Sequence, residues 1–239
     1  MKHILSLILV LAVTMVHAQK EINDPHAEQR NVPAFNQINV SNAFDVYLVQ
    51  GNENALAVSA SDNEVKSKIE TYVKNNILYI KFDQDKKFWK GWNNNKINLK
   101  AYISFKDLEK ININGACNVI VVGAIKTNKL DIHLSGASDM KGKLNVNDLA
   151  INLSGASDMD ITGTVTNAKI DVSGASEFKG FNMVTDYCNA DASGASGIRI
   201  TVNKELSVRA SGASDVGYKG TGMIREIKTS GASNVSKRS

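Results

Sequence analysis

The sequence predicts an all-β chain folded as a β-solenoid, with coils of about 19 residues and an irregular β region at its N-terminal end. The first observation is a five-residue phrase of the type Ser-Gly-Ala-Ser-Asp that recurs at a nearly constant interval, as solenoid repeats do. The second is strict alternation of apolar and polar residues on both sides of the phrase, which is typical of strands with one buried face. A right-handed solenoid is expected because crossovers between parallel strands nearly always have that hand.

The phrase occurs seven times, and its glycines are separated by 21, 19, 19, 20, 18 and 19 residues. Glycine adopts a positive φ without steric cost, so each phrase predicts a sharp corner between two strands. We expect the alanine to fill the inside of the corner and the serines to bond the turn backbone. The predicted corner glycines are Gly115, Gly136, Gly155, Gly174, Gly194, Gly212 and Gly231.

The strands on either side of a corner have a fixed inward pattern. The residues two and four positions before the glycine are apolar or small, and an apolar residue returns four positions after it. Period-two alternation places all of these side chains on the buried face. The sequence therefore predicts two columns inside one continuous core, Leu134–Leu153–Val172 and Met140–Met159–Phe178.

The chain divides into four segments. Residues 1–18 have the charged start, short apolar run and small-residue cleavage site of a signal peptide, and residues 19–34 are a polar, flexible lead-in. Residues 35–110 form the irregular N-terminal β region, and residues 111–239 form the regular solenoid of seven repeats. We expect export to the periplasm, the outer surface or the medium, with no transmembrane segment, because the apolar run is too short to span a bilayer.

The irregular region begins with a degenerate repeat. The run Ile38–Val49 matches Ile111–Val122 position by position, with Asn42 in place of the corner glycine. Asparagine tolerates the left-handed conformation better than most residues, so a corner is also expected at Asn42. The pair Asn75-Asn76 predicts a tight hairpin between two strand-like runs. The sequence leaves open whether residues 50–110 are further coils or a separate β unit.

These phrases resemble the family known as putative auto-transporter adhesin, head GIN domain. The resemblance rests on Ile38–Val49, Ile111–Val122 and the repeated Ser-Gly-Ala-Ser-Asp, and it covers roughly residues 35–235. Proteins of this family are exported all-β proteins of Bacteroidetes-type bacteria. The resemblance implies the fold and export of this chain, and it brings no catalytic motif.

The strongest candidate binding site is the loop around the two tryptophans of the chain. It contains Trp89, Lys90, Trp92 and Asn93, and aromatic faces beside amides and cations are suited to holding sugars. The alternative is that both tryptophans fold back and cover the end of the solenoid.

The acidic residues at the ends of the phrases form a second candidate site. A column of Asp139, Asp158 and Glu177 could hold calcium between coils, because calcium takes oxygen ligands. The alternative is that these side chains close the corner by bonding their own backbone. No other metal and no cofactor is expected.

A third candidate is the outward pair Asp171 and Asp191, which is followed on later coils by Arg209 and Lys228. Polysaccharide-degrading solenoids use outward acidic clusters, so this pair could be catalytic. A solvated face with an Asp191–Arg209 pair between neighbouring strands explains the residues equally well. The sequence predicts no cleft at this position.

The remaining features favour a binding protein over an enzyme. Cys117 and Cys188 should be free thiols, because four coils separate them by about 19 Å, beyond the roughly 7 Å that a disulfide spans. With Lys2 removed, 27 basic residues face 24 acidic ones, a balance too mild for nucleic acid. We therefore expect an exported, non-enzymatic binding or scaffold protein of the cell envelope with glycan or protein partners. A polysaccharide hydrolase or lyase is one alternative, and a structural unit that self-associates through an uncapped C-terminal coil is the other.

Overall fold

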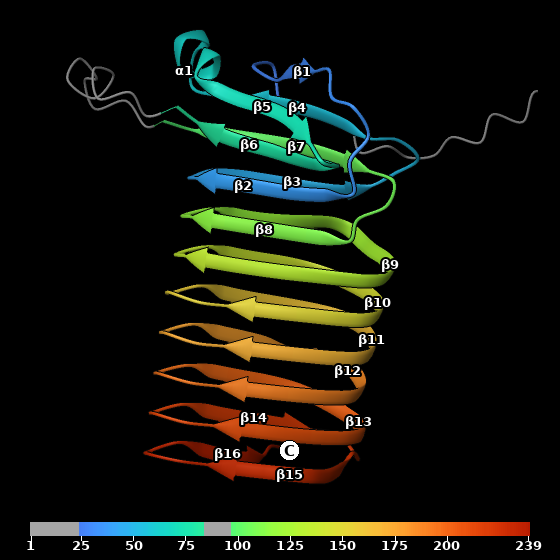
Figure 1. The fold of residues 1–239 in the computed structure, drawn as a ribbon, viewed down its shortest axis with the longest axis vertical. Coiled ribbons are helices and arrows are strands. Elements are labelled where there is room, and N and C mark those ends of the chain that lie inside the picture. The colour runs from blue at the N-terminus through green and yellow to red at the C-terminus, as the bar shows by residue number, and fades with distance from the viewer. Residues whose placement is uncertain (1–23, 84–96) are drawn as a thin grey trace, which may run out of the picture.

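The computed structural model describes residues 24–83 and 97–239. Strand accounts for 69% of the chain and helix for 2%, and the strands form a β-solenoid of about seven coils, which confirms the predicted fold class. The coils stack along one long axis, with the N-terminal elements at one end and the C-terminal coil at the other (Figure 1). Among the described residues, no helix has the length and apolar character needed to cross a bilayer.

Each regular coil is one long strand that bends back on itself between two corners. We call the sheet made by the segments that lead into the corners the entry face, and the sheet made by the segments that leave them the exit face. The entry face is turned to the viewer in Figure 1. The strands of the regular coils are β8 (Lys110–Gly115), β9 (Asn118–Gly136), β10 (Asp139–Leu153), β11 (Asp158–Val172), β12 (Glu177–Ala192), β13 (Gly197–Ala210), β14 (Asp215–Lys219), β15 (Met223–Thr229) and β16 (Asn234–Lys237).

Neighbouring coils pair as parallel strands in the register that the repeat predicts. Leu153 lies between Leu134 and Val172, and Met159 lies between Met140 and Phe178. All six of these side chains are buried. The two predicted core columns are therefore confirmed.

The corner glycines all have positive φ, between 70° at Gly231 and 122° at Gly115. Every corner also stacks closely on the one before it. A Cβ at Gly155 would collide with the carbonyl oxygen of Gly136, one coil earlier. The amide N–H of each corner alanine donates to the carbonyl of the corner residue one coil earlier, as Ala156 does to Gly136 at 2.8 Å and Ala116 to Asn42 at 2.7 Å. Glycine is thus required both for its conformation and for the absence of a side chain.

The corner alanine does not fill the inside of the turn, so that part of the prediction is wrong. The alanines are exposed, and the second serine of the phrase points inward instead. Ser157 is fully buried: its hydroxyl donates to the Ser154 carbonyl at 3.0 Å and accepts the Ser138 amide N–H at 3.4 Å. Serine is small enough for this position, and its hydroxyl satisfies backbone groups that would otherwise be buried without partners.

The degenerate first repeat forms a coil of the solenoid. Its strands are β2 (Gln37–Asn42) and β3 (Phe44–Gln50), which pair in parallel with β8 and β9. Asn42 lies opposite Gly115 and has a φ of 84°, as the alignment of the two runs predicts. The Asn42 side chain also accepts the amide N–H of Phe82 at 2.9 Å. An asparagine thus serves as the corner residue and as a link to the next layer.

The rest of the irregular region is part coil and part antiparallel cap. We call this part the cap, together with strand β1 (Glu28–Arg30) of the lead-in, and its other elements are β4 (Ala55–Ser59), α1 (Asn63–Ser67), β5 (Ile69–Lys74), β6 (Ile77–Phe82) and β7 (Leu99–Phe105). Strands β6 and β7 stack in parallel on β2 and β3 and make one more coil, although they follow them in the chain. Strands β5, β4 and β1 are antiparallel and cover the outer side of that coil. The hairpin predicted at Asn75-Asn76 joins β5 to β6, and both asparagines have positive φ.

The segment predicted as a flexible lead-in is partly ordered. Within it, Glu28–Arg30 pairs with β4. The Asp24 carboxylate accepts a hydrogen bond from the Tyr102 hydroxyl at 2.8 Å and lies 3.4 Å from the Lys100 ammonium. Burial alone would raise the pKa of Asp24, but the hydrogen bonds from Tyr102, the His26 amide and Ser59, with Lys100, lower it from 3.8 to about 2. The lead-in is thus attached to the rest of the cap by a strand pair and by the partly buried Asp24 carboxylate.

Candidate functional site

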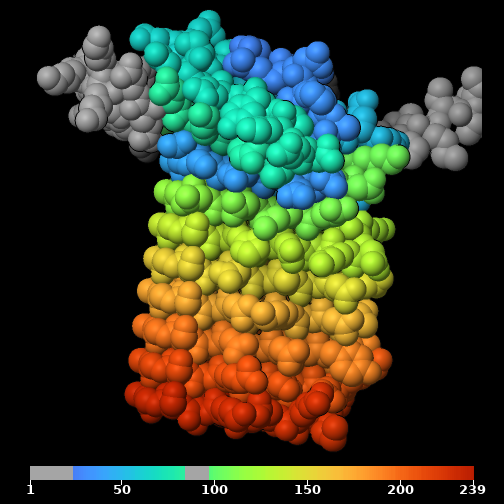
Figure 2. Space-filling model, in the orientation of Figure 1, coloured from blue at the N-terminus to red at the C-terminus, as the bar shows by residue number. Residues whose placement is uncertain are grey.

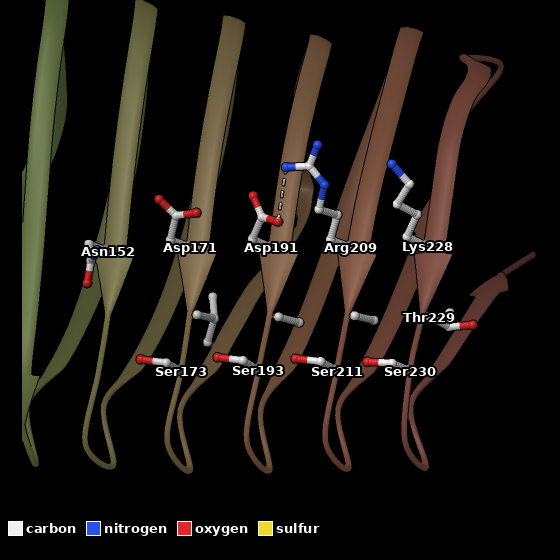
Figure 3. A pocket seen from close by; sticks show the side chains of 13 residues that line it. Asn152, Asp171, Ser173, Asp191, Ser193, Arg209, Ser211, Lys228, Thr229 and Ser230 are labelled. Atoms are coloured by element: carbon white, nitrogen blue, oxygen red, sulfur yellow. Dashed lines mark ion pairs between the residues drawn. The ribbon is translucent and has the colours of Figure 1, made fainter.

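A straight row of polar side chains crosses the entry face in the C-terminal half of the solenoid. Each member stands three residues before a corner glycine, and each is paired in register with the next along the axis. Figure 3 shows the row on successive strands, just before the corners. We call it the polar row, and its members are Asn152, Asp171, Asp191, Arg209 and Lys228.

A second row of hydroxyl groups runs parallel to the first, and the surface between the two is hollowed. The serines that open each corner phrase, Ser173, Ser193, Ser211 and Ser230, form this second row (Figure 3). The hollow has a volume of about 480 Å³. Its floor is formed by Val172, Ala192, Ala210 and Thr229, which occupy the column that holds Leu134 and Leu153 in earlier coils. The hollow therefore lies where this column changes from leucine to smaller side chains.

A second hollow of about 550 Å³ adjoins the first and shares Asp191 and Arg209 with it. The other charged residues that line it are Lys169, Arg225 and Glu226. We call the two hollows together the polar groove. The sequence predicted no cleft beside Asp171 and Asp191, and the structure corrects that expectation. The only available signal was the change from leucine to alanine two residues before the corner glycine.

The charges of the polar row are ordered along the axis, with two carboxylates followed by two cations. The Arg209 guanidinium lies 4.0 Å from the Asp191 carboxylate, which confirms the predicted pair between neighbouring strands, and 3.4 Å from Glu226. The Lys169 ammonium lies 3.3 Å from Asp171. These are exposed pairs, and such pairs contribute little to stability. The groups are consequently free to exchange partners with a ligand.

One carboxylate of the row, that of Asp191, ionises less readily than an ordinary aspartate. Partial burial, and then the neighbouring Asp171 carboxylate, raise the pKa of Asp191, and Arg209 and Lys169 oppose the shift. Asp191 therefore takes up a proton at a higher pH than an ordinary aspartate does. A protonated Asp191 can donate a hydrogen bond to a ligand, whereas the ionised form can only accept one.

The predicted calcium column is placed as expected, but two of its three carboxylates already pair with one lysine. Asp139, Asp158 and Glu177 lie opposite one another on the exit face. The Lys179 ammonium lies 3.0 Å from Asp158 and 3.2 Å from Glu177, and these hydrogen bonds, Asp158 first, raise the pKa of Lys179. Within residues 24–83 and 97–239, no group of three or more His, Cys, Asp or Glu side chains is arranged to hold a metal ion. Calcium binding here stays a prediction that no contact supports.

The remaining predicted residues are those of the tryptophan loop and the two cysteines. Trp89, Lys90, Trp92 and Asn93 lie outside the described residues, as does the predicted signal peptide. Cys117 and Cys188 are both buried, and neither is in a disulfide. Burial raises the pKa of the Cys188 thiol to about 12, so this thiol stays protonated and unreactive.

Several solved structures share this fold. A putative adhesin from Bacteroides fragilis superposes with a TM-score of 0.81 at 20% identity, covering 89% of this chain and 96% of its own. A putative lipid binding protein from Parabacteroides distasonis gives a TM-score of 0.67 at 21% identity, covering 91% and 98%. A putative adhesin from Parabacteroides merdae gives 0.67 at 15%, covering 89% and 95%. None of the curated proteins matches the chain. The model of one family matches residues 34–222, and the chain therefore belongs to that family, described as putative auto-transporter adhesin, head GIN domain.

Proposed function

We propose that the protein is an exported, non-enzymatic, adhesin-like protein of the cell envelope that holds an extended glycan in the polar groove. Family membership and the adhesin names of similar structures support a binding or adhesin-like role. The observation that carries the finer proposal is the pair of parallel rows, one charged and one of hydroxyls, with a hollow between them. Rows that repeat at every coil suit a ligand that itself repeats.

The chemistry of the groove favours a sugar polymer as that ligand. Asp171, Asp191 and Asn152 can hydrogen-bond sugar hydroxyls, and the serine row adds groups that both donate and accept. Arg209 and Lys228 can receive a carboxylate or phosphate substituent at one end. Lipid binding, named for the Parabacteroides distasonis protein, is less well supported, because polar side chains supply both rows of the groove.

Export rests on the signal peptide predicted at residues 1–18. Family membership is consistent with it. Mass measurement of the protein recovered outside the cytoplasm should show a chain that begins near Gln19. Recovery of the uncleaved chain from the cytoplasm would contradict this part of the proposal.

The groove can be tested on a glycan array that carries neutral and acidic oligosaccharides, followed by titration of any glycan bound. Asp191→Asn and Arg209→Ala should each weaken binding about tenfold or more, because hydrogen bonds to charged groups contribute roughly 1.5–3 kcal/mol. Asp160→Asn and Lys141→Ala are matched controls, since both residues are exposed on the exit face. Equal losses in the controls, or full affinity in the groove variants, would place the site elsewhere.

One observation favours the enzymatic alternative. Asp171 and Asp191 stand on neighbouring strands, about 4.8 Å apart in a parallel sheet, and the pKa of Asp191 is raised. Retaining glycosidases hold two carboxyl groups roughly 5 Å apart, one of which has a raised pKa. Release of reducing ends or unsaturated products from a polysaccharide panel, abolished by Asp191→Asn, would establish a hydrolase or lyase and refute the non-enzymatic proposal.

The tryptophan loop is a separate proposal for a contact region. Trp89 and Trp92, with Lys90 and Asn93, combine aromatic, cationic and amide groups in one short segment. Stacking on each ring could supply about 1 kcal/mol or more, so the double change Trp89→Ala and Trp92→Ala should weaken glycan binding. The melting temperature should stay that of the wild type if the loop is a contact region. A large loss of stability would instead show that the tryptophans cover the core.

A further inference from the structure

The last coil of the described chain exposes the interior of the solenoid. Ile224 and Ile227 continue two core columns whose previous members, Leu206 and Val208, are fully buried. The exposed fractions of Ile224 and Ile227 are 37% and 41%, and that of Met223, on the same strand, is 66%. In Figure 2 no layer lies beneath this coil, drawn in red. An apolar end face of this kind is typical of surfaces that another protein covers.

The two strands that border this end face have free edges. Strand β15 pairs only with β13, and β16 pairs only with β14, among the described strands. Each therefore presents unpaired backbone N–H and C=O groups along one side, which is a template for pairing with a further strand. Both strands lie beyond residue 222, where the family match ends. A partner that covers this end face must supply one strand edge for β15, another for β16, and an apolar surface between them.

The opposite end of the molecule does not meet that requirement. Antiparallel strands β1, β4 and β5 cover it, and helix α1 lies at the same end (Figure 1). Val65 of α1 is buried there, so the core is closed at this end. Head-to-tail stacking of two copies would set β15 and β16 against this closed cap. The same end of a second copy offers two free edges around an open core.

We propose that two copies of this chain associate tail to tail through their last coils, about a two-fold axis that sets β15 antiparallel to β15 of the second copy. A two-fold axis joins like surfaces, so the strand must be complementary to itself. Pairing centred on Ile227 places the two Ile227 side chains opposite each other in the core. The same register places Glu226 opposite Lys228 of the second copy, twice by symmetry.

Charge and side-chain direction agree in this register. Residues directly opposite each other in antiparallel strands lie on the same face of the sheet. Ile227 belongs to an inward column, and Glu226 and Lys228 line the hollows of the entry face. Glu226 already pairs with Lys228 within one copy, so association exchanges one partner for an equivalent one. Apolar burial and the new strand pairing then favour the dimer.

The tail-to-tail dimer would affect the proposed glycan binding, but the dimer does not require that proposal to be correct. Continuous pairing of β15 with its counterpart keeps both entry faces on one side of the dimer, so the two polar grooves meet end to end. A polymer long enough to reach both grooves binds more tightly than one that reaches a single groove. The end face has only the area of one coil's cross-section, so association buries little surface and the interface belongs to the small, weak class. We therefore expect a dimer that forms and dissociates with concentration.

Sedimentation equilibrium of the purified chain tests the proposal without any glycan. The wild type should pass from monomer to dimer as concentration rises, with no larger species. Glu226→Lys and Lys228→Glu should each weaken dimerisation several-fold to about tenfold, and the double exchange should restore it, because only the exchange recreates both pairs. Glu70→Lys and Lys81→Glu, which alter an exposed pair on the cap, should change nothing.

Thiol crosslinking tests the register. Because Cys117 and Cys188 are buried, an Ile227→Cys variant carries one exposed thiol among the described residues, next to its counterpart across the axis. Mild oxidation should give a covalent dimer much faster than it does for Val184→Cys, an exposed control position away from the end face. A monomer at every concentration, chains longer than two, or equal crosslinking of the two cysteine variants would overturn the proposal.

Discussion

The regular coils and the cap belong to one core but are specified in different ways. In the coils, one repeated phrase sets the corner, the register and the inward residues, so that order in space follows order in sequence. In the cap, the coil of β6 and β7 stacks outside that of β2 and β3, although it comes later in the chain. Parallel pairing holds that coil in place, and single contacts that do not recur, Asn42 with Phe82 and Asp24 with Tyr102, add to it. Repeated residues specify the coils, and residues that occur once specify the cap.

The largest expected effect is a loss of stability on removing a buried leucine from either region, and it tests whether the two regions unfold together. Leu153→Ala in a regular coil and Leu78→Ala in the cap remove equally buried leucines from one hydrophobic cluster. Each should lower the free energy of unfolding by about 2–5 kcal/mol, through lost burial and the cavity left behind. Chemical denaturation followed by circular dichroism should show a single transition in both variants. A separate early transition in Leu78→Ala alone would show that the cap is an independent unit.

The next largest effect is expected at the corners, where a glycine corner and the asparagine corner should respond differently to substitution. Gly155→Val forces a β-branched residue to a φ of 78° and sets its Cβ against the Gly136 carbonyl. Strain at such positions costs of order 1–3 kcal/mol, so a clear loss of thermal stability is expected. Asn42→Gly keeps the corner conformation and loses only the bond to Phe82, so it should cost about 1 kcal/mol. A melting temperature for Gly155→Val within a degree of the wild type would refute the corner model.

The smallest effect lies in the cap and depends on pH. The pKa of Asp24 is lowered on folding, so its ionised form stabilises the protein, fully so above about pH 4. This contribution, about 2 kcal/mol at most, should disappear as the pH falls from about 4 to about 2. Asp24→Asn should lose it at neutral pH and flatten the pH dependence of stability. Asp107→Asn, at an exposed position, is the control and should follow the wild type.

Repetition also explains what the sequence could predict. The corner glycines, both core columns and the Asn42 coil were predicted correctly because each follows from a pattern with several copies to compare. The row from Asp171 to Lys228 followed from the same register. The inward serine was missed because serine and alanine both fit a small space. The signal was present, because period-two alternation counted back from the inward Met159 places Ser157, and not Ala156, on the buried face.

Non-repeated features were beyond pattern reasoning. Nothing in the sequence places β6 and β7 outside β2 and β3, since that depends on which strand edges remain free after the first coil closes. The pairing of Glu28–Arg30 with β4 involves three residues without an apolar pattern. The polar groove could not be predicted because it depends on the shape of the surface. Alternation gives the direction in which a side chain points, but not how deep the surface is between two rows of side chains.

The serine hydrogen bonds at the corners link neighbouring coils, and the same bond recurs from Ser138 to Ser157 and from Ser157 to Ser176. A coil of 19 residues, such as the one that runs from Gly136 to Gly155, can therefore be duplicated or lost without leaving a mismatch at either junction. Each such event changes the length of the solenoid by one strand spacing, about 4.8 Å. Gene duplication can in this way adjust the reach of the molecule in uniform increments, while the cap and the end face stay unaltered.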